Sequence, residues 1–131
     1  MANEVAFTAY PTATRTYDAG FTVLFDGIIT NIGGFYDSDT SVFTCPYTGV
    51  YLFNVVLLSE NGQYMDASIT KEGSILAYAY ADNNNADQGS TTVVTECQAF
   101  DSVRIECYGN NNQLALGQRS SFTGVLLSAY S

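Results

Sequence analysis

The chain has no histidine and no tryptophan, and it has few basic residues. It carries 4 Lys and Arg residues against 13 Asp and Glu residues, so its net charge is −9. Without histidine, Ser-His-Asp and Cys-His catalysis are impossible, and the commonest ligand of transition metals is missing. The negative charge repels phosphate backbones and anionic membrane surfaces, which argues against nucleic acid and membranes as partners. These absences favour a protein that is not an enzyme.

Long apolar runs are also absent. No segment approaches the ~18 apolar residues of a transmembrane helix. Residues 1–10 lack the basic and then apolar pattern of a signal peptide. If the native protein is secreted, its signal has been removed and Met1 was added for expression. The 131 residues are 47% hydrophobic, which predicts a single domain, residues 1–131, with a full core.

Short segments rich in Val, Thr, Tyr and Phe alternate with turn residues along the whole chain, and no segment holds a helical pattern. This arrangement is typical of all-β sandwiches and barrels. The candidate strands are 5–10, 22–30, 34–37, 42–45, 49–58, 64–71, 74–81, 90–98, 102–108 and 122–128. Ten strands joined by short turns predict a jelly roll of two antiparallel sheets.

The candidate strand 49–58 is apolar on both faces. Its two alternating sets are Tyr51, Phe53, Val55 and Leu57, and Val50, Leu52, Val56 and Leu58. Only one face of a strand meets the core in a two-layer sandwich. The other face needs a cover, and one domain of this size has no third layer. A partner subunit is the simplest cover, so we expect an oligomer.

The three cysteines, Cys45, Cys97 and Cys107, fit no zinc-binding spacing. An odd number leaves at least one thiol unpaired within the chain. Cys97 and Cys107 are expected on neighbouring strands of one hairpin, in a register too distant for a disulfide. The sequence therefore predicts three buried thiols, with one disulfide or one reactive thiol as the alternatives.

Two polar segments, 82–88 and 109–113, are rich in asparagine. Asparagine favours turns because it tolerates a left-handed backbone. These segments are either solvated loop tips or oxygen-rich surfaces for a hard cation or for sugar hydroxyls. Tyr17, Tyr78 and Tyr80 could stack on sugars, and the alternative for each is packing in the core or at a subunit interface.

Several segments, in order along nearly the whole chain, resemble the C1q-like domain, the globular head of complement C1q. The matching segments are Ala6-Phe7-Thr8-Ala9-Tyr10, Phe25-Asp26 with Asn31-Ile32-Gly33 and Tyr36-Asp37, Phe43-Thr44-Cys45-Pro46-Tyr47-Thr48-Gly49-Val50-Tyr51-Leu52-Phe53, and Ser121-Phe122-Thr123-Gly124-Val125-Leu126-Leu127. Pro46 removes a ladder donor and ends a strand, and Gly49 permits the bend before the next one. Tyr51 and Phe53 share a face and are expected in the core. Where related heads usually have a Gly-Asp turn, this chain has Phe100-Asp101.

The resemblance implies a ten-stranded jelly roll, shared with the tumour necrosis factor superfamily and assembled as a homotrimer. It also implies a secreted, extracellular module that binds a glycan or protein ligand and is not an enzyme. One interpretation is multivalent, lectin-like recognition in innate immunity, because three weak sites on a trimer gain avidity. The alternatives are a structural trimerisation domain in matrix or secretion, and a cytokine-like or organiser ligand for a receptor. The ligand-binding residues themselves stay open.

Some C1q-like heads bind calcium near the trimer axis through an Asp-Gln pair, an earlier Asp and carbonyl groups. Asp87-Gln88 resembles the pair, whereas Ala79 stands where the earlier Asp belongs. Asp82 could replace that ligand. The resemblance thus implies Asp82, Asp87 and Gln88 as ligands of calcium, which takes ~6–8 oxygen atoms. The alternative is a solvated acidic loop.

Overall fold

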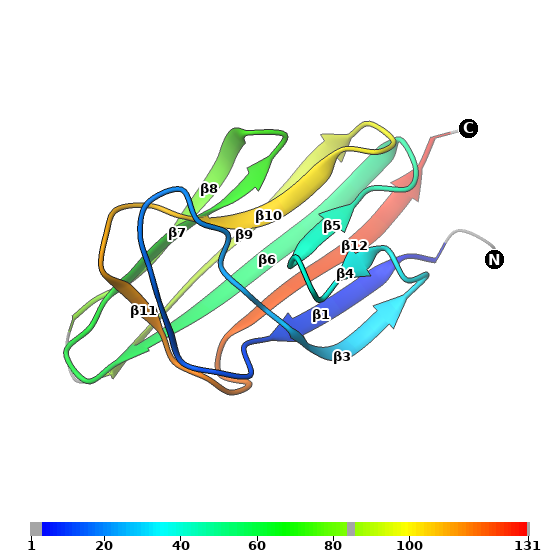
Figure 1. The fold of residues 1–131 in the computed structure, drawn as a ribbon. Helices are drawn as coiled ribbons and strands as arrows, with labels where there is room; N and C mark the ends of the chain where they lie inside the picture. Colours follow the sequence, from blue (N-terminus) through cyan, green and yellow to red (C-terminus); the bar gives the residue numbers. More distant parts are fainter. Residues whose placement is uncertain (1–3, 84–85, 131) are drawn as a thin grey trace.

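The computed structural model describes residues 4–83 and 86–130, which fold as twelve strands (Figure 1). The strands are β1 (Ala6–Tyr10), β2 (Arg15–Tyr17), β3 (Gly27–Ile32), β4 (Tyr36–Asp37), β5 (Val42–Thr44), β6 (Gly49–Glu60), β7 (Met65–Lys71), β8 (Ser74–Ala81), β9 (Ala86–Cys97), β10 (Ser102–Cys107), β11 (Asn112–Leu114) and β12 (Ser121–Ala129). Within the described ranges, no helix has the length and apolarity to cross a membrane.

The strands form two antiparallel five-stranded sheets packed face to face. The first sheet has the order β3-β1-β12-β6-β9 and the second has the order β4-β5-β10-β7-β8. A two-stranded ladder of β11 and β2 lies at one end, between the long connections of the sandwich (Figure 1). The all-β, two-sheet jelly-roll prediction is therefore confirmed.

Aromatic side chains from both sheets fill the space between them. The ring of Phe7 stacks on Tyr36 and on Phe43, with centroids 4.6 Å and 4.9 Å away, and meets Phe122 edge to face at 4.8 Å. On β6, Tyr51 and Phe53 are fully buried, as the alternation predicted. Edge-to-face and offset contacts of this kind add to the stabilisation that burial provides.

Gly49 shows why the matched segment needs a glycine where β6 begins. A Cβ atom there would lie 2.2 Å from the carbonyl oxygen of Ser128 on β12. Any larger residue would push β6 and its neighbour β12 apart. Pro46 lies in the connection between β5 and β6, as expected for a residue that cannot extend a ladder.

The predicted strand 22–30 is wrong in its first half, because β3 begins only at Gly27. The segment before it passes from one sheet to the other. The Val23 amide donates to the Ile105 carbonyl of β10 in the second sheet, whereas Gly27 pairs with Tyr10 of the first. A chain that changes sheets cannot continue one ladder.

Parts of both asparagine-rich segments lie in strands, so the two loops are shorter than predicted. β9 begins at Ala86, so Asp87 and Gln88 lie on a strand opposite Ser59 and Leu58 of β6. β11 begins at Asn112, whose side chain is fully buried rather than solvated. The short strands β2 and β11 were missed because each has three residues and a single large apolar or aromatic side chain, Tyr17 or Leu114, which is too few to show an alternation.

The predicted hairpin carrying Cys97 and Cys107 is wrong. Cys97 ends β9 in the first sheet, whereas Cys107 ends β10 in the second, so the turn between the strands crosses the sandwich. All three cysteines are nevertheless free and buried. The prediction of three buried thiols is confirmed.

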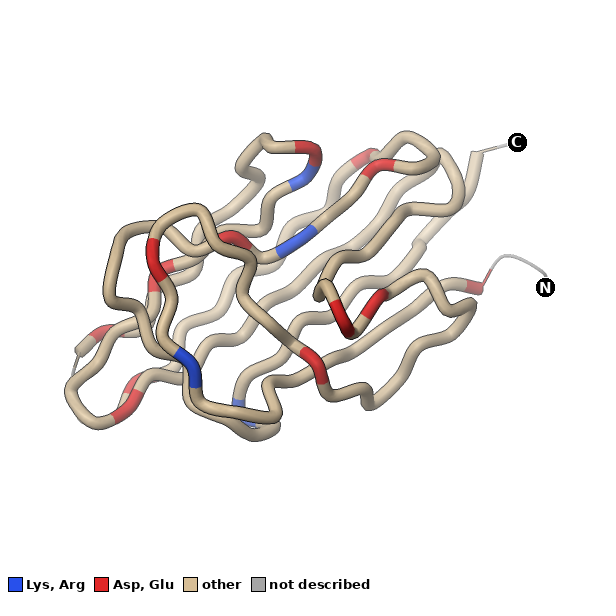
Figure 2. Tube along the Cα trace, viewed as in Figure 1, with Lys and Arg blue, Asp and Glu red and all other residues tan. Residues whose placement is uncertain are grey.

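Acidic residues are spread over the ends and edges of the sandwich, and the basic residues are few and well separated (Figure 2). Two of the basic residues form ion pairs in the structure, Arg15 with Asp26 at 3.0 Å and Arg104 with Glu106 at 3.3 Å. The described surface therefore has no basic patch that would attract a polyanion.

Candidate functional site

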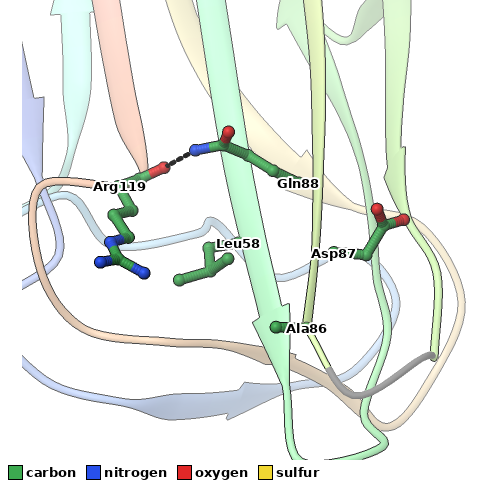
Figure 3. A pocket seen from close by; sticks show the side chains of 5 residues that line it. All are labelled: Leu58, Ala86, Asp87, Gln88 and Arg119. Atoms are coloured by element: carbon green, nitrogen blue, oxygen red, sulfur yellow. Dashed lines mark hydrogen bonds between the residues drawn. The ribbon is translucent and has the colours of Figure 1, made fainter.

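Asp87 and Gln88 lie at the start of β9, beside a hollow of about 520 Å³ that Leu58, Ala86 and Arg119 also line. Neighbouring residues of a strand face opposite ways. In Figure 3 the Gln88 side chain accordingly reaches across Leu58, while the Asp87 carboxylate points to the other side. The Gln88 amide donates to the Arg119 carbonyl oxygen at 2.6 Å. The structure thus separates the side chains of the predicted Asp-Gln pair.

Asp82 lies on the same side as the Asp87 carboxylate. Its backbone amide donates to Oδ2 of Asp87 at 2.7 Å, and its own Oδ1 accepts the Asn83 amide at 2.7 Å and the Tyr80 hydroxyl at 3.3 Å. Residues 84 and 85 of this predicted loop lie outside the described residues.

Within one chain these residues do not make a calcium site. Two carboxylates supply too few oxygens for an ion that takes ~6–8 of them. No group of three or more Asp, Glu, Cys or His side chains gathers as metal ligands anywhere in residues 4–83 and 86–130. A calcium site involving Asp82, Asp87 and Gln88 would need oxygen atoms from other subunits, and it stays a prediction.

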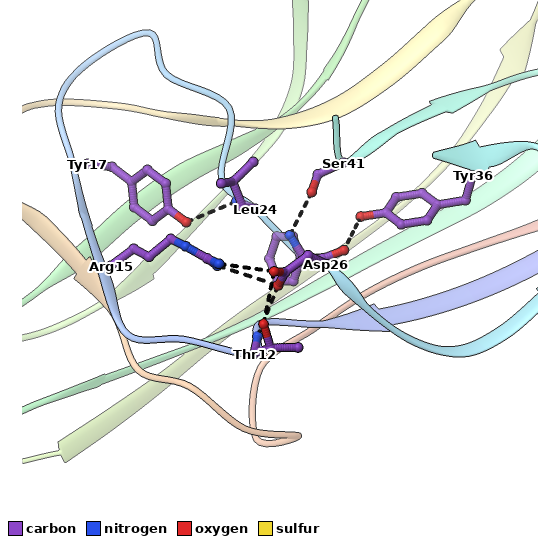
Figure 4. A network of polar contacts seen from close by, with 8 residues as sticks. Thr12, Arg15, Tyr17, Leu24, Asp26, Tyr36 and Ser41 are labelled. Carbon is purple, nitrogen blue, oxygen red and sulfur yellow. Dashed lines mark hydrogen bonds and ion pairs between the residues drawn. The ribbon is translucent and has the colours of Figure 1, made fainter. Parts of the chain in front are cut away.

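A second polar cluster surrounds Asp26, just before β3 (Figure 4). Its carboxylate accepts the amide and hydroxyl of Thr12, at 3.1 Å and 2.9 Å, and the Arg15 guanidinium at 3.0 Å. Burial opposes the charged form, but the hydrogen bonds from Arg15 and Thr12 outweigh it and lower the pKa of Asp26 to about 2. All of these partners hold the carboxylate in hydrogen bonds within the fold. The cluster therefore stabilises the segment that passes from the second sheet to the first, and its groups are not free to act on a ligand.

The backbone beside Asp26 is held in the same way. The Tyr17 hydroxyl accepts the Leu24 amide at 3.0 Å, and the Ser41 hydroxyl accepts the Phe25 amide at 2.8 Å. The Tyr36 hydroxyl donates to the Phe25 carbonyl at 2.6 Å. Tyr17 is 7% exposed, so it packs in the core and does not offer a stacking surface for sugars.

Two of the three buried thiols, Cys45 and Cys107, are held in the protonated form. Cys45 and Cys97 are neighbours: the interaction with Cys97 and burial raise the pKa of Cys45, and the same interaction lowers the pKa of Cys97. Burial, with Asp66 nearby, raises the pKa of Cys107 to about 12. A thiol is reactive as the thiolate, so Cys45 and Cys107 are inert at neutral pH.

Tyr78 and Tyr80 stand out on the outward face of the second sheet, 54% and 51% exposed. The structure adds three residues that sequence reasoning missed: Tyr64, Asp66 and Tyr108. Asp66 is cross-strand to Tyr80, and the Tyr108 amide donates to the Asp66 carbonyl at 2.8 Å. The alternation of β7 and β8 could have placed Asp66 beside Tyr80, but Tyr108 joins them only through the pairing of β10 with β7.

The outward face of the first sheet is uncharged over two consecutive cross-strand rows. One row is apolar and consists of Ile32, Ala6, Val125, Leu52 and Val94. The next row is polar and consists of Thr30, Thr8, Thr123, Asn54 and Thr92. In the polar row the hydroxyls of Thr8 and Thr123 are 2.9 Å apart, and the Asn54 amide donates to Thr92 at 2.9 Å. Four of the five polar side chains in this row thus hydrogen-bond to one another, and the apolar row beside them has no cover within the described part of the subunit.

Comparisons with known proteins agree with this architecture. The sequence profile of the C1q domain matches residues 6–127. Complement C1q tumor necrosis factor-related protein 3 of Mus musculus is 29% identical over 128 residues, which are 95% of this chain and 51% of that protein. The chain thus spans about half the length of this curated relative.

Solved structures show the same fold at low sequence identity. The globular domain of zebrafish complement 1qA protein superposes with a TM-score of 0.81 at 17% identity, covering 98% of this chain and 100% of that one. Murine APRIL gives 0.75 at 14% identity, covering 95% and 100%, and Eiger TNF from S. frugiperda gives 0.75 at 12% identity, covering 98% and 95%. With the profile match over nearly its whole length, the chain belongs to the C1q domain family.

Proposed function

We propose that the chain is the head of a secreted, extracellular recognition module that assembles as a homotrimer and binds its ligand multivalently. Membership of the C1q domain family supports this role and supports a non-enzymatic module. A trimer displays three copies of one weak site, so avidity could exceed each affinity by ~10²–10⁴. Lectin-like recognition in innate immunity is one form that this binding would take.

The apolar row across the first sheet carries the proposal of assembly. Leu52 and Val125 lie on the two central strands of that row, and Val94, on the edge strand β9, is 55% exposed. Left in water, a row of branched apolar side chains loses the stabilisation that burial against another surface would give. Two further copies of the chain would bury it, and the hydrogen bonds of Thr8 with Thr123 and of Asn54 with Thr92 would lower the cost of burying the polar row beside it.

The first experiment is to measure the mass in solution by light scattering, in calcium and in chelator. Three copies of the 14.2 kDa chain give about 43 kDa. A mass of 43 kDa in both buffers supports the trimer, with calcium at most a local stabiliser. A monomer in both buffers would rule out the multivalent model.

Val94→Glu tests which face assembles. The side chain is exposed in a single subunit, so the substitution leaves the folded monomer intact but places three charges in the proposed interface. We expect the mass to fall to that of a monomer. Ile75→Glu is the matched control, because Ile75 is 44% exposed on the second sheet. A trimer that survives Val94→Glu would move the interface to another surface.

Calcium enters this proposal only between subunits. A trimer that dissociates in chelator would support a site shared by Asp82, Asp87 and Gln88 of several copies. Asp87→Ala should then remove the increase in melting temperature that calcium causes. If the variant keeps the full increase, Asp87 is not a ligand.

A further inference from the structure

The outward face of the second sheet carries an aromatic cluster around one carboxylate, which we call the tyrosine face: Tyr64, Asp66, Tyr78, Tyr80 and Tyr108. Cross-strand neighbours on one face of an antiparallel sheet have Cβ atoms ~5 Å apart, and diagonal neighbours are still within reach of aromatic side chains. Asp66 of β7 has Tyr80 of β8 on one side and Tyr108, just after β10, on the other. The carboxylate therefore stands between tyrosines contributed by both neighbouring strands.

The tyrosines form two diagonal pairs beside Asp66. The rings of Tyr78 and Tyr108 meet at right angles with centroids 5.6 Å apart, and the rings of Tyr64 and Tyr80 are tilted with centroids 6.2 Å apart. Ser68, which follows Asp66 on the same face and is cross-strand to Tyr78, is 2% exposed. Large neighbours thus cover the sheet beside Asp66, although Tyr78, Tyr80 and Tyr108 are themselves about half exposed.

Asp66 has no compensating charge. Among the described residues, no hydrogen-bond donor or cation reaches its carboxylate, and burial alone raises its pKa. The nearest basic side chain on this face, Arg104, is engaged with Glu106 at 3.3 Å and with the Thr22 hydroxyl at 2.7 Å. Asp82, bonded to the Tyr80 hydroxyl, adds a second negative charge at the border. A half-buried unpaired carboxylate is destabilised, and a cation placed beside it would relieve that cost.

We propose that the tyrosine face binds lysine side chains of a basic protein segment. Tyrosine rings attract an ammonium group through their quadrupole, the Asp66 carboxylate supplies the counter-charge, and the phenolic oxygens accept ammonium hydrogen bonds. The net charge of −9 draws a polycation toward the protein and repels phosphate-bearing ligands. This face belongs to the sheet that the proposed trimer leaves open, so three copies would act together. The multivalent binding rests on the proposed function, because it requires the trimer. The lysine site itself lies within one subunit and does not require it.

The test measures binding of a fluorescein-labelled oligolysine peptide by anisotropy, with an oligoserine peptide of equal length as the neutral reference. Asp66→Asn keeps the shape and removes the charge, and we expect binding to weaken by up to about fivefold. Tyr80→Leu and Tyr108→Leu should each weaken binding about two- to fivefold through the lost cation–π contact. Asp39→Asn is the matched control, because it removes an exposed carboxylate from the distant connection between β4 and β5.

The outcomes separate a built site from general charge attraction. Equal weakening by Asp66→Asn and Asp39→Asn would overturn the proposal, as would oligoserine binding as tightly as oligolysine. A neutral glycan that binds more tightly than oligolysine, and whose binding is weakened by Tyr80→Leu and Tyr108→Leu but not by Asp66→Asn, would assign the face to sugars and overturn the lysine ligand. The thermal midpoint of Asp66→Asn should equal or exceed that of the wild type, which excludes misfolding. The light-scattering mass is independent of this face, so the trimer and the lysine site fail separately.

Discussion

The two five-stranded sheets and the two long connections of the sandwich, residues 11–26 and 108–120, are stabilised by different forces. In the sheets, alternating apolar residues meet across a common core, and the ladders continue without help from side chains. In the connections, the short β2–β11 ladder and a few other backbone hydrogen bonds leave groups that individual polar side chains satisfy. The stability of the sandwich therefore comes from many apolar contacts of one kind, whereas the stability of the connections depends on a few specific hydrogen bonds.

Phe7→Ala tests the sandwich and should have the largest effect. The ring is 1% exposed and contacts three aromatic rings from both sheets. Losing it leaves a cavity that the sheets cannot close, so we expect the free energy of unfolding to fall by about 3–5 kcal/mol in urea denaturation. Phe21→Ala, in the first connection and 63% exposed, is the control and should cost less than about 1 kcal/mol.

The difference between the sheets and the connections explains which parts of the fold could be predicted from the sequence. The alternation of β6 identified its buried face, Tyr51 and Phe53 included, because a strand with one face in the core repeats every second residue. β2 and β11 have no such repeat, and the burial of Asn112 depends on where Asp66 and Tyr108 lie in space. Local patterning carries no information on such contacts.

The same limit applies to the candidate sites. The family resemblance pointed to Asp87 and Gln88, but not to their placement on a strand, where their side chains diverge. Tyr108 lies 42 residues beyond Asp66 in the chain, and only the strand order β10-β7-β8 brings it to the tyrosine face. Sheet order is a property of the whole fold, so this cluster could not be found from spacing alone.

Asn112→Ala tests the connections. The Asn112 side chain accepts the Asp66 amide at 2.6 Å and donates to the carbonyl oxygens of Tyr108 and Gly109 at 3.3 Å and 2.9 Å. Alanine leaves these buried backbone groups without their partner, so we expect a loss of about 2–3 kcal/mol in the free energy of unfolding. Asn110→Ala, which removes one exposed hydrogen bond, should cost below about 1 kcal/mol. Equal losses in the two variants would mean that the connections do not depend on Asn112.

Acid should weaken the connection at Asp26 before it affects the core. The pKa of Asp26 is lowered to about 2 by Arg15 and Thr12 against the opposing effect of burial. The stabilisation is complete above the unfolded pKa near 4 and is lost as the pH falls toward 2. The side chain is 30% exposed, so solvent screening limits the effect to about 1–2 kcal/mol.

The measurement is the difference in urea midpoint between the wild type and Asp26→Asn at several pH values. Asparagine does not titrate, so this difference should shrink between pH 4 and pH 2. Asp39→Asn serves as control for the removal of an exposed carboxylate. A difference that stays constant over this range would contradict the assigned ion pair.

The smallest effect is expected in the turn between β9 and β10, at Phe100. Phe100 has a φ of 76° and is 81% exposed. A left-handed backbone costs an L-residue ~1–2 kcal/mol, and glycine loses ~0.5–1 kcal/mol more entropy on folding. Phe100→Gly should therefore raise the free energy of unfolding by about 0.5 kcal/mol at a fixed protein concentration. Phe100→Ala keeps the Cβ atom and the strain, so it should leave stability unchanged. If the free energy of unfolding rose equally in both variants, the exposed aromatic ring, and not the left-handed backbone, would be the source of the cost. The stability of this turn would then be limited by solvent exposure of the ring rather than by backbone strain.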